Sequence, residues 1–197
     1  MKFFILIPIY NDWKSVLKLI ENINLQLEDN DNKITIFIIN DASTEETPII
    51  KGEYKNFLSV KIINIKNNLG NARCIATGLK YVYENFEFDY VIPMDGDGED
   101  RPEEIKNFIN LAKQNSNEPI VGKRVKRSEG LIFKINYFIH KIVTLVLTGK
   151  SIKFGNFTCL PKNTVYKLIN DKSTWSSFSG SLSKLEKKLV FSPSDRG

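Results

Sequence analysis

The sequence predicts an α/β fold in which a mostly parallel sheet is covered by helices on both faces. Short apolar, β-branched runs alternate along the chain with longer segments whose apolar residues recur at helical spacing. The runs are apolar at nearly every position, which is typical of strands buried on both sides. With 197 residues, of which 42% are hydrophobic, the chain can bury one sizeable core. We therefore expect a single domain over residues 1–197.

Strands are predicted at residues 3–9, 34–39, 60–65 and 90–94, with a short fifth strand at 120–121. Their order, with helices between them, favours a sheet of parallel strands. In such sheets ligands bind at the carboxyl ends of the strands. Asp41, Arg73 and Asp95 are expected to lie along that edge.

The predicted helices fill the intervals between these strands. The first begins at Asn11 or Asp12 and reaches about Leu27. Its buried face is expected to carry Val16, Leu17, Ile20, Ile23 and Leu27. A weak helix broken near Gly52 precedes the third strand, and a turn at residues 67–73 leads into the next helix. That helix carries Ala72, Ile75, Ala76, Leu79 and Val82 on one side. Pro102, followed by Glu103 and Glu104, starts another helix.

The apolar run that precedes residue 95 stops abruptly in an acidic, glycine-rich loop, residues 95–100. Asp95 and Asp97 point the same way if the chain stays extended, and Gly96 lets the backbone approach a ligand closely. Carboxylates at this spacing suit Mg²⁺ or Mn²⁺, which keep open positions for substrate phosphates. The loop is therefore interpreted as a diphosphate clamp, and a solvated acidic turn is the simpler alternative.

Other metal and phosphate motifs do not fit. An EF-hand loop starting at Asp95 requires Gly at the position of Asp100 and Glu at that of Lys106. A phosphate-binding P-loop ending at residues 149–151 requires Gly at the position of Thr144. We interpret residues 149–151 as the end of a helix.

A net charge of +5 and a pI near 9.0 favour anionic partners, including phosphate-bearing substrates and membrane surfaces. Nucleic acid is not expected, because the lysines are scattered and no nucleic-acid-binding motif accompanies them. The one dense basic patch spans residues 123–127. Cys74 and Cys159 each lie among apolar or small residues, which indicates reduced core thiols. With no signal-peptide pattern at the amino terminus, we expect a cytoplasmic protein.

Four blocks of sequence, taken together, resemble a known family. They are residues 7–12, 38–44, 68–73 and 94–97, and their order and spacing match the inverting glycosyltransferases of family 2. The resemblance implies a GT-A fold, which is Rossmann-like, with a nucleotide-binding half over about residues 1–100 and an acceptor half over about 101–197. Residues 95–103 are similar to the branch that transfers sugars to dolichyl or undecaprenyl phosphate.

The resemblance also implies roles for particular residues. A UDP- or GDP-sugar donor would contact Pro8, Tyr10, Asn11, Asp41, Gly70, Arg73, Asp95 and Gly96, with Asp41 on the base. The metal, Mg²⁺ or Mn²⁺, would be held by Asp95, Asp97 and Glu99. Asp95, Asp97 and Arg124 are the implied catalytic residues, with Lys123 and Arg124 at a position that faces phosphate. A solvated basic patch at residues 123–127 is the alternative for that last assignment.

Two positions and the length of the chain depart from the family pattern. Asn40 stands where the first Asp of an Asp-Asp pair is usual, and Asn156 stands where many lipid-phosphate enzymes have Asp. Family members also continue further, often into transmembrane helices, whereas this chain ends at Arg196 and Gly197. We therefore expect an enzyme domain that is shortened at its carboxyl end.

The acceptor is inferred from what the sequence lacks. A hydroxyl acceptor needs a general base, and the sole histidine, His140, lies in an apolar stretch where catalysis is not expected. A polyprenyl phosphate, with a second pKa of about 6, is already anionic at neutral pH. Residues 131–147 suit a helix lying at the inner face of the membrane, and a buried or homodimer-forming helix is the alternative. Trp13 and Trp175 are assigned to the core or to an interface.

Two other functions stay open from the sequence. One is a family 2 enzyme that acts on a hydroxyl acceptor in glycan synthesis. The other is a module that binds the nucleotide sugar but has lost transfer activity. A nucleotidyltransferase is disfavoured, because no glycine-rich basic loop follows the first strand.

Overall fold

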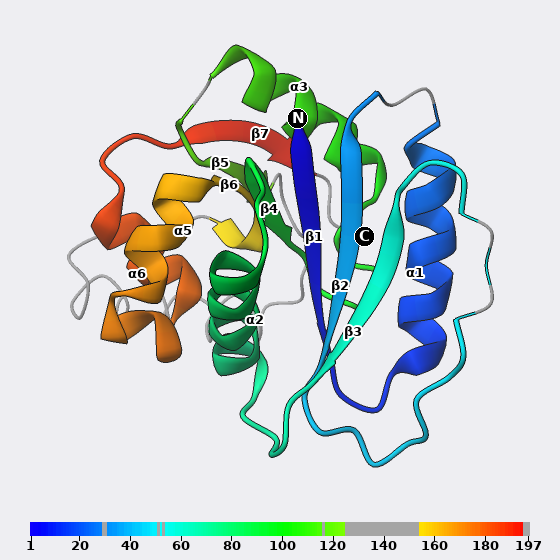
Figure 1. Cartoon of the computed structure of the whole chain (residues 1–197). Coiled ribbons are helices and arrows are strands. Elements are labelled where there is room, and N and C mark those ends of the chain that lie inside the picture. Colours follow the sequence, from blue (N-terminus) through cyan, green and yellow to red (C-terminus); the bar gives the residue numbers. More distant parts are fainter. Residues whose placement is uncertain (29–30, 51, 53, 116, 125–153, 195–197) are drawn as a thin grey trace, which may run out of the picture.

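A computed structural model gives the arrangement of the chain (Figure 1). It describes residues 1–28, 31–50, 52, 54–115, 117–124 and 154–194. The predicted interfacial helix at 131–147, His140, the helix end at 149–151 and residues 125–127 of the basic patch lie outside these residues. In the part of the chain that is described, no helix is long and apolar enough to cross a membrane.

One seven-stranded sheet runs through the molecule, in the order β3-β2-β1-β4-β6-β5-β7. The strands are β1 (Lys2–Ile9), β2 (Lys33–Asn40), β3 (Ser59–Asn64), β4 (Tyr90–Pro93), β5 (Ile120–Arg124), β6 (Phe154–Pro161) and β7 (Val190–Ser194). All neighbouring pairs are parallel except the two that involve β6, which is antiparallel to both β4 and β5. The predicted mostly parallel sheet is confirmed.

Helices cover both faces of this sheet, as predicted. They are α1 (Trp13–Gln26), α2 (Asn71–Asn85), α3 (Glu103–Gln114), α5 (Lys162–Ile169) and α6 (Phe178–Leu185), with a 3₁₀ turn, η1, at Lys172–Trp175. The apolar residues of α1 and α3 pack on one face, and those of α2, α5 and α6 pack on the other. Figure 1 shows α2 and α5 next to each other on their common face.

The central strand β1 explains why the sequence is apolar at consecutive positions. Phe3, Ile5 and Ile7 point into the α1–α3 side of the core, whereas Phe4 and Leu6 point into the α2–α5–α6 side. Each is at least 94% buried, and burying such a side chain contributes roughly 1.5–3 kcal/mol. Because side chains alternate along β1, the helical layers on both faces of the sheet pack against this one strand.

Some details of the expected elements are wrong. No helix forms around Gly52 among the described residues between β2 and β3, because Pro48 and Gly52 both oppose helical structure. On α1, Leu19 is buried while Leu17 is only half-buried. Trp13 lies in the core, which is one of its two predicted positions, whereas Trp175 is 41% exposed and its interface alternative stays a prediction. The strands β6 and β7 and the helices after β6 were not predicted from the sequence.

Candidate functional site

The carboxyl ends of β1, β2, β3 and β4 meet at one edge of the sheet, because the four strands are parallel. Asp41 follows β2 and Asp95 follows β4, while Arg73 lies exposed in the first turn of α2. The predicted placement of these three residues on one edge is confirmed. The side-chain amide of Asn71, at the start of α2, lies 3.4 Å from Oδ1 of Asp95 and joins α2 to the end of β4.

The loop before α2 is held by Asp41. Its two carboxylate oxygens accept hydrogen bonds from the backbone N–H groups of Leu69 and Gly70, each at 2.8 Å. Asp41 is 3% exposed, so these bonds offset the cost of burying a charge. Gly70 has a φ of 80°, a conformation that favours glycine. The sequence predicted Asp41 and Gly70 as nucleotide contacts. The structure adds that Asp41 holds the backbone of Gly70 in position.

Burial, with the charge of Asp41 as a second cause, raises the pKa of the neighbouring Cys74 thiol to about 12. The thiol donates a hydrogen bond to the carbonyl of Ile39 at 3.5 Å. Cys159 is fully buried, and burial raises the pKa of its thiol as well. Both thiols stay protonated at neutral pH and pack as apolar groups, in agreement with the sequence prediction of reduced core cysteines.

Asn11 ties the loop after β1 to the loop after β2. Its backbone N–H donates to Oγ of Ser43 at 2.9 Å, and its side-chain oxygen accepts from the N–H of Thr44 at 2.8 Å. Asn11 and Ala42 both have positive φ, of 51° and 58°. Pro8 is buried in β1, while Tyr10 is 49% exposed just beyond its end. The predicted nucleotide roles of Pro8, Tyr10 and Asn11 stay predictions.

Asn40, which stands where the family pattern usually has Asp, makes two side-chain hydrogen bonds in the structure. The amide of Asn40 donates to Oδ1 of Asn64 at 2.9 Å, and its side-chain oxygen accepts from the N–H of Ser43 at 3.0 Å. A carboxylate at this position could not donate to Asn64. Asn40 therefore links the ends of β2 and β3 through an amide pair.

Within the acidic loop, the chain turns instead of staying extended. β4 ends at Pro93 and residues 96–98 form a turn, so the alternation argument for Asp95 and Asp97 does not apply. Oδ1 of Asp97 accepts from the N–H of Glu99 at 2.9 Å, which stabilises the turn. A Cβ on Gly96 would lie 3.2 Å from the carbonyl oxygen of Pro8. Glycine is therefore favoured here by the close approach of the loop to β1.

Two hydrogen bonds that the sequence did not predict hold Asp95 in place. Its backbone N–H donates to Oδ2 of the fully buried Asp100 at 2.8 Å, and its Oδ1 accepts from the amide of Asn156 at 3.1 Å. Asn156 is on β6, the antiparallel strand next to β4. Because β6 is distant from Asp95 in the sequence, no local signal could have revealed the contact with Asn156. Asp100 lies in the acidic loop itself, and its contact with Asp95 depends on how that loop folds back.

The described residues contain no group of three or more Asp, Glu, His or Cys side chains placed to hold a metal ion. Asp95, Asp97 and Glu99 are thus not gathered into a ready-made site. A magnesium ion commonly takes only one or two carboxylates from the protein and the rest from phosphates and water. The donor set fits an ion that binds together with a diphosphate.

The basic pair reaches the same edge through β5. This strand is antiparallel to β6, which is itself antiparallel to β4, so β5 runs in the direction of β4. Arg124 is the last residue of β5 and pairs with Ser194 of β7. Its backbone therefore lies at the edge that carries Asp95, and its predicted catalytic role stays a prediction.

Fold and site together define an α/β domain with a candidate ligand site at the carboxyl ends of its parallel strands, and the comparisons identify the family. Residues 4–168 match the family described as glycosyl transferase family 2, and the chain belongs to this family. It is similar to a UDP-N-acetylglucosamine–dolichyl-phosphate N-acetylglucosaminyltransferase from Methanococcus voltae, with 30% identity over 78% of this chain and 63% of the relative. The predicted family assignment is confirmed.

A second relative is the undecaprenyl-phosphate 4-deoxy-4-formamido-L-arabinose transferase of Salmonella choleraesuis. It is 26% identical over 81% of this chain and 47% of its own length. Both relatives support the predicted resemblance to the polyprenyl-phosphate branch. The chain spans about half to under two thirds of the length of these relatives.

Among solved structures, the fold matches the mannosyltransferase PcManGT of Pyrobaculum calidifontis in complex with GDP-Man and Mn²⁺. The TM-score is 0.60 with 12% sequence identity, over 97% of this chain and 54% of the other. This similarity concerns the fold, and it confirms the predicted GT-A class.

Proposed function

We propose that the chain transfers a sugar, with inversion, from a nucleotide-diphosphate sugar to a polyprenyl phosphate. The observation that carries this proposal is one edge of the sheet. There the loop at Leu69 and Gly70, which Asp41 holds in place, meets the acidic loop and the start of α2. The N-terminus of α2, the carboxylates of the acidic loop and the exposed Arg73 are the kinds of group that recognise a nucleoside diphosphate. The relatives that act on dolichyl and undecaprenyl phosphate support the choice of acceptor.

In the proposed reaction, an oxygen of the lipid phosphate attacks the anomeric carbon from the face opposite the nucleotide. The bond from this carbon to the diphosphate breaks, and its electron pair leaves with the nucleoside diphosphate. Because a phosphate monoester is ionised at neutral pH, no protein base has to remove a proton. Asp41 fixes the position of Leu69 and Gly70, and this orients the loop at the nucleotide.

Asp95 and Asp97, with Glu99 nearby in the loop, are proposed to hold Mg²⁺ or Mn²⁺ jointly with donor phosphate oxygens. Such an ion neutralises charge on the leaving diphosphate when it is bound. Asn71 and Asn156 keep Oδ1 of Asp95 oriented by donating neutral hydrogen bonds to it. The Mn²⁺ in the PcManGT complex supports this proposal.

The test is a transfer assay with undecaprenyl and dolichyl phosphate against a panel of UDP- and GDP-sugars. Mass spectrometry should show a lipid product heavier by one sugar residue, with release of the nucleoside diphosphate. Asp95→Ala should abolish the product, whereas Glu28→Ala, an exposed substitution beyond α1, should not. Donor binding without any transfer would favour the inactive-module alternative, and transfer only to soluble hydroxyl acceptors would overturn the lipid-phosphate acceptor.

A further inference from the structure

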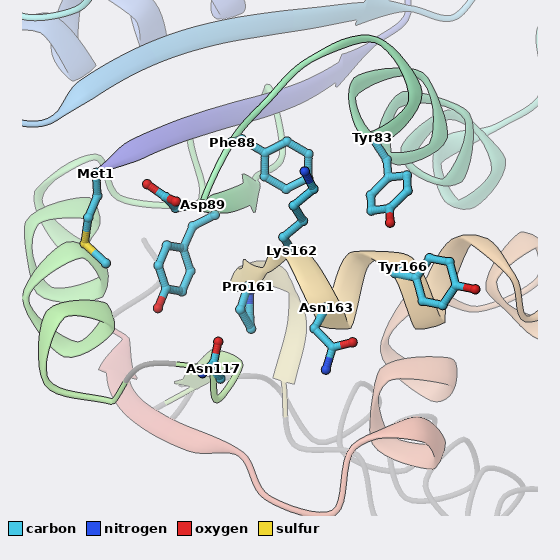
Figure 2. A pocket seen from close by; sticks show the side chains of 10 residues that line it. Met1, Tyr83, Phe88, Asp89, Asn117, Pro161, Lys162, Asn163 and Tyr166 are labelled. Atoms are coloured by element: carbon cyan, nitrogen blue, oxygen red, sulfur yellow. The ribbon is translucent and has the colours of Figure 1, made fainter.

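The amino-terminal edge of the sheet, opposite the candidate site, contains a hollow of about 570 Å³ (Figure 2). It lies where β1 and β4 begin, and where β6 ends and α5 starts. Its lining is Met1, Tyr83, Phe88, Asp89, Tyr90, Asn117, Pro161, Lys162, Asn163 and Tyr166. A volume of this size is typical of ligand pockets.

Aromatic side chains form both the base and the rim of this hollow. Phe88 and Tyr90 are each only 4% exposed, whereas Tyr166 is 52% exposed. Tyr83 on α2 and Tyr166 on α5 have ring centroids 5.8 Å apart, with planes tilted by 38°. Figure 2 shows the two rings facing each other across the gap between their helices. The hollow thus offers an aromatic surface open to water.

The base of the hollow is rigid. Tyr90 stacks on Phe3 with ring centroids 5.2 Å apart, and its hydroxyl donates to the carbonyl of Ala112 at 3.2 Å. The ammonium of Lys162 pairs with Glu87 at 2.7 Å and lies 5.7 Å from the centre of the Phe88 ring. These contacts fix the buried rings in place before any ligand arrives.

A second hollow of about 430 Å³ adjoins the first and shares Met1, Phe88 and Asp89 with it. The ionisable side chains that line or border the two hollows are Lys2, Lys33, Lys162, Asp31, Glu87 and Asp89. With the amino terminus of Met1, four cationic groups face three carboxylates, so this surface is close to neutral although the whole chain carries a net charge of +5. A strongly charged ligand such as a nucleotide gains little from a nearly neutral surface.

We infer that these joined hollows bind a neutral oligosaccharide. The apolar face of a sugar ring can pack on Tyr166 and Tyr83, while the exposed amides of Asn117 and Asn163 can donate to and accept from its hydroxyl groups. The extension into the second hollow favours several sugar units over one. A peptide is less suitable, because the groove crosses strand ends and offers no row of backbone groups for strand addition.

This site does not depend on the proposed transfer reaction, because it lies at the other end of the strands. Its occupancy is measured without nucleotide, metal or lipid. The probes are four neutral trisaccharides: cellotriose, maltotriose, mannotriose and chitotriose. Saturation-transfer NMR should detect weak binding of at least one of them to the full chain, and titration calorimetry should give its affinity.

The contacts above predict which variants matter. Tyr166→Ala and Asn163→Ala should each weaken binding of that trisaccharide by at least about fivefold, as expected for contacts that dominate a site. Tyr166→Phe should retain binding because it keeps the ring, and this variant separates lost recognition from a lost fold. Tyr81→Ala is the matched control, since Tyr81 is an exposed tyrosine of α2 outside the hollow.

Three results would overturn the inference. The first is that none of the four trisaccharides binds. The second is that Tyr166→Ala and Asn163→Ala, in chains that unfold at the same temperature as the native one, bind as well as the native chain. The third is displacement of the trisaccharide by UDP, which would place the sugar at the candidate nucleotide site.

Discussion

The side-chain amide of Asn156 donates a hydrogen bond of 3.1 Å to Oδ1 of Asp95, although 61 residues separate the two in the chain. Asn71 approaches the same oxygen at 3.4 Å. The orientation of the Asp95 carboxylate therefore depends on residues from α2 and β6.

Asn156→Asp should turn this hydrogen bond into a repulsive contact between two carboxylates. We expect the variant to have a lower thermal unfolding temperature than the native chain in the presence of a chelator. Added Mn²⁺ with UDP should stabilise the variant more than the native chain, because the second carboxylate adds an oxygen ligand. Asn156→Ala, which only removes a donor, is the control. Equal stabilisation of the Asp and Ala variants by Mn²⁺ would contradict the proposed ion position.

Asp97→Ala should remove the metal dependence of nucleotide binding and leave the fold intact, because Asp97 is exposed and its hydrogen bond among the described residues is a local one, to Glu99 in the same turn. Calorimetry with UDP or GDP, in Mn²⁺ and in chelator, measures the effect. The native chain should bind more tightly with Mn²⁺, and the variant equally in both conditions. Native binding that is unchanged by chelator would refute the metal assignment.

Asp41→Ala should destabilise the chain and weaken nucleotide binding both with and without metal. Two charge-assisted hydrogen bonds to Leu69 and Gly70 are lost, and each such bond is worth roughly 1.5–3 kcal/mol. Urea unfolding and calorimetry with UDP or GDP measure the two effects. Asp41→Asn retains one acceptor oxygen, so its stability and its nucleotide affinity should lie between those of Asp41→Ala and those of the native chain. Normal binding by Asp41→Ala would place the nucleotide elsewhere.

The pairing of Asp171 with Ser173 and Lys184 predicts how stability depends on acidity. The Ser173 hydroxyl, followed by the Lys184 ammonium at 2.9 Å, lowers the pKa of the Asp171 carboxyl from 3.8 to about 2. Since the folded pKa is the lower one, the carboxylate stabilises the fold above about pH 4, and this contribution is lost as the pH falls towards 2.

Asp171→Asn should therefore lower the free energy of unfolding at pH 7, by at most about 2 kcal/mol. The difference from the native chain should shrink between about pH 4 and pH 2. Denaturant unfolding at several pH values measures it, with Glu28→Ala as an exposed control. A difference that is constant over this range would show that the effect is steric and not electrostatic.

The first half of the chain was predictable because its signals are local. The sequence runs that form β1, β2 and β4 are apolar on both faces. Gly70 marks the start of α2, and Gly96 marks the turn that follows β4. The strand β6 carries Gly155 and Asn156 within a mixed sequence and has no comparable pattern. Its pairing with β4 is set by tertiary contacts, so the amide contact to Asp95 could not be foreseen.

The same contrast applies to the site: residues within local sequence patterns were predicted, whereas contacts that depend on tertiary structure were not. Asp41 and Asp95 were found because each follows a recognisable strand, and Arg73 because it lies in the first turn of a recognisable helix. The hydrogen bonds of Asp41 to the loop at Gly70, and the buried Asp100 beneath Asp95, depend on how the loops fold back. The expected alternation of Asp95 and Asp97 was wrong because β4 ends before them.

The position of β6 between β4 and β5 also has a consequence for synthesis on the ribosome. One side of β4 bonds to β1, but the other side bonds only to β6, which is made about 60 residues later. Until residue 161 has emerged, the nascent chain presents the open edge of a central, apolar strand. Such an edge can pair with another chain, so we expect the interval between the synthesis of the two strands to expose this protein to misassembly.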